Sequence, residues 1–232
     1  MIQLSKRLQT VANSVTRGMV VADIGTDHGY IPIYLVSENI CKKAYAMDVR
    51  KGPLERARAN VEKMGLSDSI EVRLSDGLKK LQIGEANSIV ISGMGGHLIT
   101  DILDARKDIL ETVSELILSP HSDACVVRHY LHDNNFVIVD EKMLMEDNKF
   151  YTIIKAKPGK EQYDKEVYYE YGKHLLYNKE VTLKQFLEIE IRKYEKVKAI
   201  LQNSDNETQK KRMLEVEDKL RCMNEGMAFF NN

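Results

Sequence analysis

The segment best suited to chemistry is a loop with two glycines that follows a short apolar run, residues 20–30, VVADIGTDHGY. Gly25 and Gly29 allow the backbone to adopt positive φ or to approach a ligand closely, as nucleotide-cofactor loops require. Asp27 stands where a dinucleotide-binding loop has its second glycine, and a carboxylate there would crowd and repel a pyrophosphate. S-adenosylmethionine has no phosphate and carries a positive sulfonium. The loop therefore favours this cofactor over NAD.

Two further aspartates follow the next two apolar runs. Asp48 ends the run AYAMD, about 20 residues beyond the loop, where an acidic side chain accepts hydrogen bonds from ribose hydroxyls. Asp76 follows the third run, in SDG, and could accept a hydrogen bond from the adenine amino group. Each aspartate alone is also explained as a turn former or a helix cap. Asp23, Asp48 and Asp76 together indicate an adenosyl site.

A fourth apolar run opens onto three glycines, residues 89–97, IVISGMGGH. Bare backbone at the end of a strand admits a flat ligand. The pattern is similar to that of class I methyltransferases, in which this edge borders the transferred methyl, so this similarity implies that the methyl acceptor lies here. A plain strand-to-helix turn is the alternative. The predicted cofactor contacts on all four segments are Asp23, Gly25, Thr26, Gly29, Asp48, Val49, Ser75, Asp76, Gly77, Gly93 and Met94.

Alternating strands and helices must position these residues. Short β-branched runs alternate with helical patterns from residue 19 to about residue 157, which is typical of a mostly parallel sheet covered by helices. The predicted strands are 19–24, 44–49, 70–75, 88–93, 115–120, 135–143 and 149–157, and the predicted helices are 3–16, 29–38, 52–64, 95–110 and 122–134. MEDNK, between the last two strands, is too short for a helical crossover, so these strands should form an antiparallel hairpin.

The tail has a different pattern. Around Lys157-Pro158-Gly159 the β pattern ends, so we predict two domains, residues 1–158 and 159–232. Heptad spacing in the second favours an antiparallel helical hairpin that turns at residues 203–206, NSDN. The apolar residues with this spacing are Leu183, Leu187, Tyr194, Val197, Leu201, Met213, Val216, Leu220, Met223 and Met227. The pattern fits a strut as well as it fits an RNA-binding arm.

Composition narrows the class of protein. The 232 residues include 34 basic and 35 acidic side chains, so any nucleic-acid surface must be a local patch. The three cysteines are far apart and suggest neither a disulfide framework nor a metal site. His129 and His132 lack a completing ligand, so we expect no metal. We see no membrane-spanning or signal segment and no sign of an obligate protein partner, and we expect a cytoplasmic enzyme.

Several of these motifs occur together in a known family. The segments LSKRL (4–8), DIGTDHGYIP (23–32), GP (52–53), SDG (75–77) and GMGG (93–96), followed by a helical hairpin, resemble the bacterial tRNA (adenine(22)-N1)-methyltransferase family. The resemblance covers nearly the whole chain. It implies a Rossmann-like class I methyltransferase fold of class α/β, with a mostly parallel seven-stranded sheet, a terminal antiparallel hairpin and a C-terminal helical coiled hairpin. One departure is Ser119-Pro120-His121, where the family pattern is Gln-Pro-Asn.

The resemblance implies methyl transfer from S-adenosylmethionine to N1 of an adenine in tRNA. Because the methylated base is cationic, a nearby carboxylate would stabilise the developing charge. Asp27 is the candidate, with His28 and Tyr30 beside it, although Tyr30 is also explained by core packing. Predicted tRNA contacts are Lys6, Arg7, Arg50, Gly95, Gly96, Pro120 and His121, and Lys51 and Arg56 are further candidates for phosphates.

Two alternatives stay open. A methyltransferase acting on another RNA, a small molecule or a protein would not depend on tRNA for cofactor turnover. A non-catalytic RNA-binding module would have no affinity for S-adenosylmethionine and no need for the three strand-end aspartates.

Overall fold

The computed structural model describes residues 2–202 and 206–231. The chain divides into two compact units, Met1–Gln162 and Tyr163–Asn232. The sequence pattern placed the boundary four residues earlier, after residue 158.

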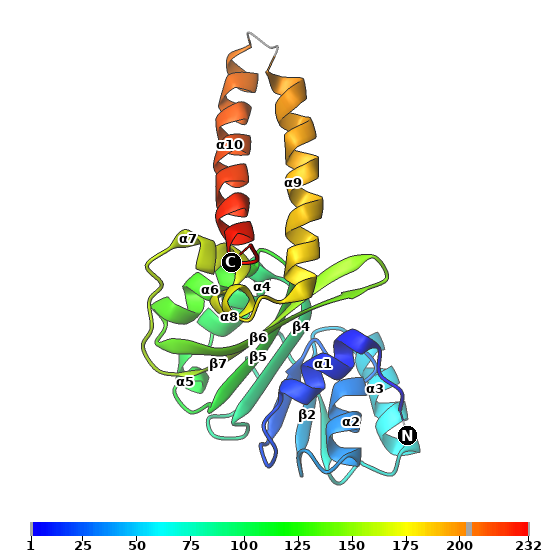
Figure 1. The fold of residues 1–232 in the computed structure, drawn as a ribbon. Coiled ribbons are helices and arrows are strands. Elements are labelled where there is room, and N and C mark those ends of the chain that lie inside the picture. Colours follow the sequence, from blue (N-terminus) through cyan, green and yellow to red (C-terminus); the bar gives the residue numbers. More distant parts are fainter. Residues whose placement is uncertain (1, 203–205, 232) are drawn as a thin grey trace. The chain divides into compact units, whose positions relative to one another are not determined.

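The first unit is built on one seven-stranded sheet in the order β3-β2-β1-β4-β5-β7-β6 (Figure 1). Strands β1 to β5 pair in parallel, and β7 pairs antiparallel with both β5 and β6. The predicted fold class is therefore confirmed. The strands are β1 (Val21–Ile24), β2 (Ala44–Asp48), β3 (Ile70–Leu74), β4 (Ser88–Gly95), β5 (Glu115–Ser122), β6 (Phe136–Glu146) and β7 (Lys149–Pro158). The strand order reverses between β1 and β4, which is where open α/β sheets bind ligands.

The described residues of the first unit form six helices, of which the first precedes β1 and the others follow β1, β2, β4 and β5. They are α1 (Lys6–Ser14), α2 (Tyr30–Ser37), α3 (Lys51–Lys63), α4 (Gly96–Asp104), α5 (Lys107–Leu110) and α6 (Ala124–Asp133). The predicted single helix 95–110 is wrong. The backbone of Arg106 leaves the helical region at φ −142°, and its guanidinium donates to the carbonyls of Leu78, Lys79 and Leu81. These long-range bonds stabilise a break that the local pattern does not reveal.

A buried carboxylate joins the ends of several elements. Glu115, fully buried at the start of β5, accepts hydrogen bonds from the Thr16 N–H and hydroxyl at 2.9 and 2.6 Å and from Ser88 Oγ at 3.0 Å. Lys155 Nζ, on β7, lies 3.1 Å from Oε2 of Glu115. Burial alone would raise the pKa of Glu115, but the bonds from Thr16 and Lys155 hold this pKa below its usual value. Glu115 is therefore a charged link between α1, β4, β5 and β7.

The described residues of the second unit form four helices, α7 (Glu166–Tyr171), α8 (Lys173–Tyr177), α9 (Val181–Leu201) and α10 (Glu207–Ala228). The predicted hairpin corresponds to α9 and α10, which pair along their length (Figure 1), while its turn at 203–205 lies outside the described residues. Leu183, Leu187, Val216, Leu220 and Met223 of the heptad stripe are buried. Val197, also in that stripe, is exposed, so the stripe is covered only over part of the hairpin.

Among the described residues, no helix is both long enough and apolar enough to span a bilayer.

Candidate functional site

A cavity of about 490 Å³ lies at the carboxyl edge of the sheet. Its walls come from the ends of β1, β2, β3 and β4 together with α1 and α4. Its size is within the range of small-molecule sites. The lining residues are Arg7, Ile24, Gly25, Asp27, Asp48, Val49, Arg50, Ser75, Asp76, Gly77, Ser92, Gly93, Met94, Leu98 and Ile102.

The loop after β1 is bent over the neighbouring strand. The backbone N–H groups of Gly25 and Thr26 both donate to the Met47 carbonyl, at 2.8 and 2.9 Å. Gly25 has φ +79°, and the Met94 side chain occupies the place where a Cβ would stand. The positive φ is therefore what favours glycine at this position, because the end of the flexible Met94 side chain could move aside.

Asp23 lies behind this loop, at the end of β1. It is buried, and burial raises its pKa to about 7, while the nearby Thr26 side chain lowers this pKa and the Asp48 charge adds a smaller increase. A buried carboxylate with a raised pKa favours a positively charged neighbour, because a cation would restore the ionised form. Asp23 and Thr26 lie outside the cavity lining, so their predicted contact with the cofactor stays a prediction.

Asp27 and His28 are held by helix α3. The Asp27 carboxylate lies 3.1 Å from Arg56 and 3.5 Å from His28 Nε2, and Asn60 Nδ2 donates to the His28 carbonyl at 3.0 Å. His28 adopts φ +63°, a conformation that costs a non-glycine residue energy and is concentrated at functional sites. Its ring stacks on Tyr30 with centroids 5.1 Å apart. Arg56, predicted as a phosphate contact, pairs with Asp27 and is half exposed, and its contact with RNA stays a prediction.

The second and third strands contribute polar side chains with ordered local contacts. Asp48 is buried and accepts the Arg50 N–H at 2.7 Å, which fixes the orientation of its carboxylate. Ser75 donates to the Gly77 carbonyl at 2.7 Å, while Asp76 is exposed and pairs with Lys79 at 2.6 Å. The predicted residues Asp48, Val49, Ser75, Asp76 and Gly77 thus meet at one end of the cavity.

Other predicted residues do not meet there. Lys6, His28, Gly29, Tyr30, Gly95, Gly96, Pro120 and His121 lie outside the lining. Gly96 is explained by packing, since a Cβ there would collide with the Asp123 carbonyl. Pro120 is buried in β5 and His121 is exposed near its end, and the expectation that they hold the base stays a prediction.

Some lining residues were not singled out from the sequence. Ile24, Ser92, Leu98 and Ile102 line the cavity, and Ile102 packs against Gly77, 2.9 Å from the place of a Cβ. The signal that could have found two of them is the spacing of Leu98 and Ile102 on α4, because side chains four apart share a helix face.

Comparison with known proteins agrees with this geometry. Residues 4–154 match the family described as a methyltransferase domain. Over 158 residues the chain is 44% identical to the tRNA (adenine(22)-N(1))-methyltransferase of Bacillus subtilis, covering 68% of this chain and 66% of that protein. The crystal structure of the B. subtilis tRNA methyltransferase TrmK has 34% identity and a TM-score of 0.90, covering 98% of this chain and all of that one.

The chain belongs to the bacterial tRNA (adenine(22)-N1)-methyltransferase family.

The cavity fits the cofactor of this family. A related Streptococcus pneumoniae protein, solved in complex with S-adenosyl-L-methionine, is 33% identical with a TM-score of 0.88, over 97% of this chain and all of that one. In the present chain, the cavity combines bare backbone at Gly25 with the carboxylates of Asp27, Asp48 and Asp76. This donor set suits a sulfonium and ribose hydroxyls and repels a diphosphate.

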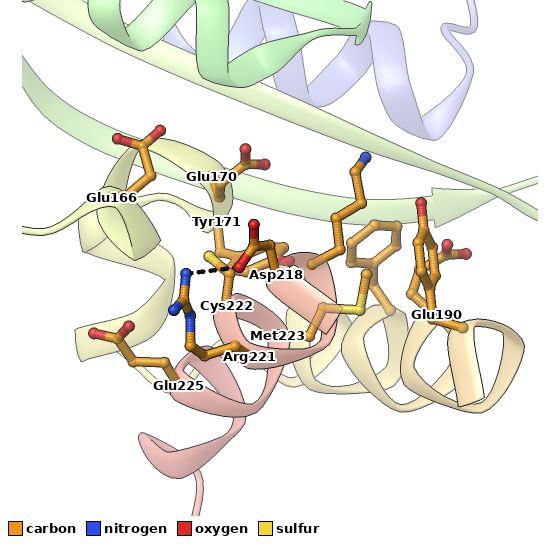
Figure 2. A pocket seen from close by; sticks show the side chains of 12 residues that line it. Glu166, Glu170, Tyr171, Glu190, Asp218, Arg221, Cys222, Met223 and Glu225 are labelled. Carbon is orange, nitrogen blue, oxygen red and sulfur yellow. Dashed lines mark ion pairs between the residues drawn. The ribbon is translucent and has the colours of Figure 1, made fainter. Parts of the chain in front are cut away.

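A second cavity, of about 430 Å³, lies within the C-terminal unit (Figure 2). Its described lining includes Glu166, Glu170, Glu190 and Glu225, and the dashed line in Figure 2 marks the 3.0 Å ion pair between Arg221 and Asp218. This lining includes none of the strand-end residues, so we assign the chemistry to the first cavity.

Proposed function

We propose that this protein transfers a methyl group from S-adenosylmethionine to N1 of the adenine at position 22 of tRNA. The observation that carries the proposal is the row of carboxylates along the carboxyl edge of the sheet, Asp27, Asp48 and Asp76, in a chain of this family.

Each group on this edge has a proposed role in holding the cofactor. Asp48, oriented by the Arg50 N–H, accepts the ribose hydroxyls. Ser75, Asp76 and Gly77 border the adenine, with Ile102 and Leu98 supplying apolar contact. Gly25 presents bare backbone to the methionine portion, and the buried Asp23 at the end of β1 adds negative charge near the sulfonium.

The enzyme's main task in the reaction is to position the base. The cofactor supplies a methyl group activated by the positive sulfonium. The adenine N1 lone pair forms the new N–C bond in line with the breaking S–C bond, which requires a separation of about 3–3.5 Å before reaction. The product base is cationic as it forms, so we propose that Asp27 stabilises this charge or accepts a proton from the exocyclic amine. Arg56 and Asn60 keep the loop in place.

The substrate must also be opened. A base within folded tRNA has to leave its stack to reach such a cavity, at a cost of a few kcal/mol. We therefore expect local distortion of the tRNA around the target adenine. Because tRNA is the proposed substrate, we expect the enzyme to act in the cytoplasm.

The direct test is to incubate the protein with labelled S-adenosylmethionine and unmodified tRNA and to analyse the nucleosides. We expect label in N1-methyladenosine at position 22. Asp27→Ala should lower kcat by at least about 100-fold, the usual contribution of such a group. Asp68→Ala, at an exposed aspartate outside the cavity, is the matched control. An Asp27→Ala rate equal to wild type would reject the assigned role, and absence of labelled adenosine with active cofactor binding would reject the substrate.

A further inference from the structure

The cavity is chemically uneven along the sheet edge. One end carries Asp48 and Asp76, at the ends of β2 and β3, together with Arg50, and the other carries Arg7, Ser92 and Gly93, beside β4. β3 and β4 are three positions apart in the sheet order, or about 14 Å at the usual strand spacing. The two ends therefore suit two different ligands, and the proposed function already assigns the acidic end to the adenosyl group.

Arg7 connects three segments that are far apart in the sequence. Its Nη1 donates to Ser92 Oγ at the end of β4, at 2.8 Å. Its guanidinium carbon lies 5.2 Å from the centre of the Tyr151 ring on β7. Its backbone N–H donates to Glu146 at the end of β6, at 3.2 Å. Contacts within the protein thus hold the guanidinium over an aromatic ring at the cavity wall.

The backbone beside the guanidinium is bare. Gly93 has φ +80°, and a Cβ built there would stand 3.6 Å from Arg7 Nη1. Any other residue would strain the backbone and place a side chain against the guanidinium. The strand end therefore keeps space for a flat ligand next to Arg7.

We propose that Arg7, backed by Tyr151 and oriented by Ser92, is the surface on which the target purine of the RNA stacks. Guanidinium planes and aromatic rings are the groups on which proteins stack unpaired bases. Arginine supplies a plane as well as a charge, whereas lysine supplies only the charge. The inference rests on the proposed function, and it replaces the sequence-based expectation that Arg7 contacts a phosphate.

The test compares kcat/KM for unmodified tRNA with the affinity for S-adenosylmethionine. Arg7→Lys and Tyr151→Leu should lower kcat/KM for tRNA by at least about tenfold, the usual effect of losing one stacking contact. The cofactor dissociation constant should stay within about threefold, because the lost contact involves only the RNA. Tyr151→Phe should recover most of the loss, since it keeps the ring. Arg17→Lys, at an exposed arginine bonded to the Asn39 carbonyl, is the matched control.

A second readout separates stacking from a structural role. With 2-aminopurine in place of the target adenine, wild-type protein should quench its fluorescence by stacking, and Arg7→Lys should leave it brighter. Unchanged tRNA kinetics and quenching in Arg7→Lys and Tyr151→Leu, or an equal loss of cofactor affinity, would overturn the inference. If Arg7→Lys does not fold, Tyr151→Leu against Tyr151→Phe decides it. Wild-type protein that transfers no methyl group to tRNA would instead overturn the proposed function.

Discussion

The two units differ in how charged side chains are paired, as Glu115 in the first and the ion pairs on α9 and α10 in the second illustrate. In the first unit, the buried Glu115 accepts a hydrogen bond from the Thr16 hydroxyl, which is 99 positions away in the sequence. In the second, the ion pairs include neighbours on one helix turn, such as Glu190 with Lys193 and Asp218 with Arg221, all on the surface or partly exposed. The difference is that the first unit contains a buried charged group bonded to distant segments, whereas these pairs of the second unit are local and exposed to solvent.

The largest expected effect comes from a matched pair of charge removals. Glu115→Gln should lower the free energy of unfolding by about 3–5 kcal/mol, because it leaves Lys155 in a largely buried site without its counter-charge. Glu217→Gln, which breaks the exposed pair with Lys198, should cost less than about 1 kcal/mol. Denaturant unfolding of each variant measures both.

The pH dependence sharpens this contrast. The folded-state pKa of Glu115 is lowered, so its contribution is present above the unfolded-state pKa and is lost as the pH falls through the folded value. The difference between wild type and Glu115→Gln should therefore shrink in acid. Equal losses of unfolding free energy for Glu115→Gln and Glu217→Gln at neutral pH would contradict the difference between the two units.

A smaller effect is expected in the apolar stripe. Leu187→Ala should destabilise the protein by about 3 kcal/mol, since Leu187 is fully buried and packs beside Gly226. Leu214→Ala, at an exposed position on α10, should change stability by less than about 0.5 kcal/mol. Thermal and denaturant unfolding would test this, and similar losses for the two variants would contradict the difference in burial between Leu187 and Leu214.

The smallest effect on stability is expected at Asp23. Its folded-state pKa is raised from 3.8 to about 7, so ionising it costs stability as the pH rises between these values. Asp23→Asn should therefore stabilise the cofactor-free protein by about 1–2 kcal/mol at pH 8, with the gain fading toward pH 4. The same variant should bind S-adenosylmethionine about tenfold more weakly, because it lacks the charge. Calorimetry at both pH values measures these opposing changes, and lower stability at pH 8 would contradict the sign.

Much of the fold follows from local patterns. Short β-branched runs predicted all seven strands, and heptad spacing predicted α9 and α10. The break between α4 and α5 was missed because it depends on Arg106 reaching the carbonyls of residues 78–81. The short helices α7 and α8 were also missed, since six and five residues are too few to show a helical period.

In the functional site, too, some residues follow from local sequence and others depend on contacts between distant segments. Asp48, Ser75 and Asp76 were predicted to be together because parallel strands end at one edge, and they line the cavity. Tyr151 was not predicted, because it reaches Arg7 only after β7 returns antiparallel beside β5. No pattern in the sequence around Tyr151 indicates that this residue lies beside the N-terminal helix.

The sequence by itself determined the cofactor chemistry and the order of strands and helices, because glycine conformations, strand-end acids and hydrophobic periods are properties of neighbouring residues. Only the tertiary structure decided which predicted residues meet. It places Arg7 beside Ser92 and Tyr151, buries Asp23 at the end of β1, and leaves His121 outside the cavity lining. The physical reason is that burial, pKa shifts and contacts between distant segments arise from packing, which no short stretch of chain contains.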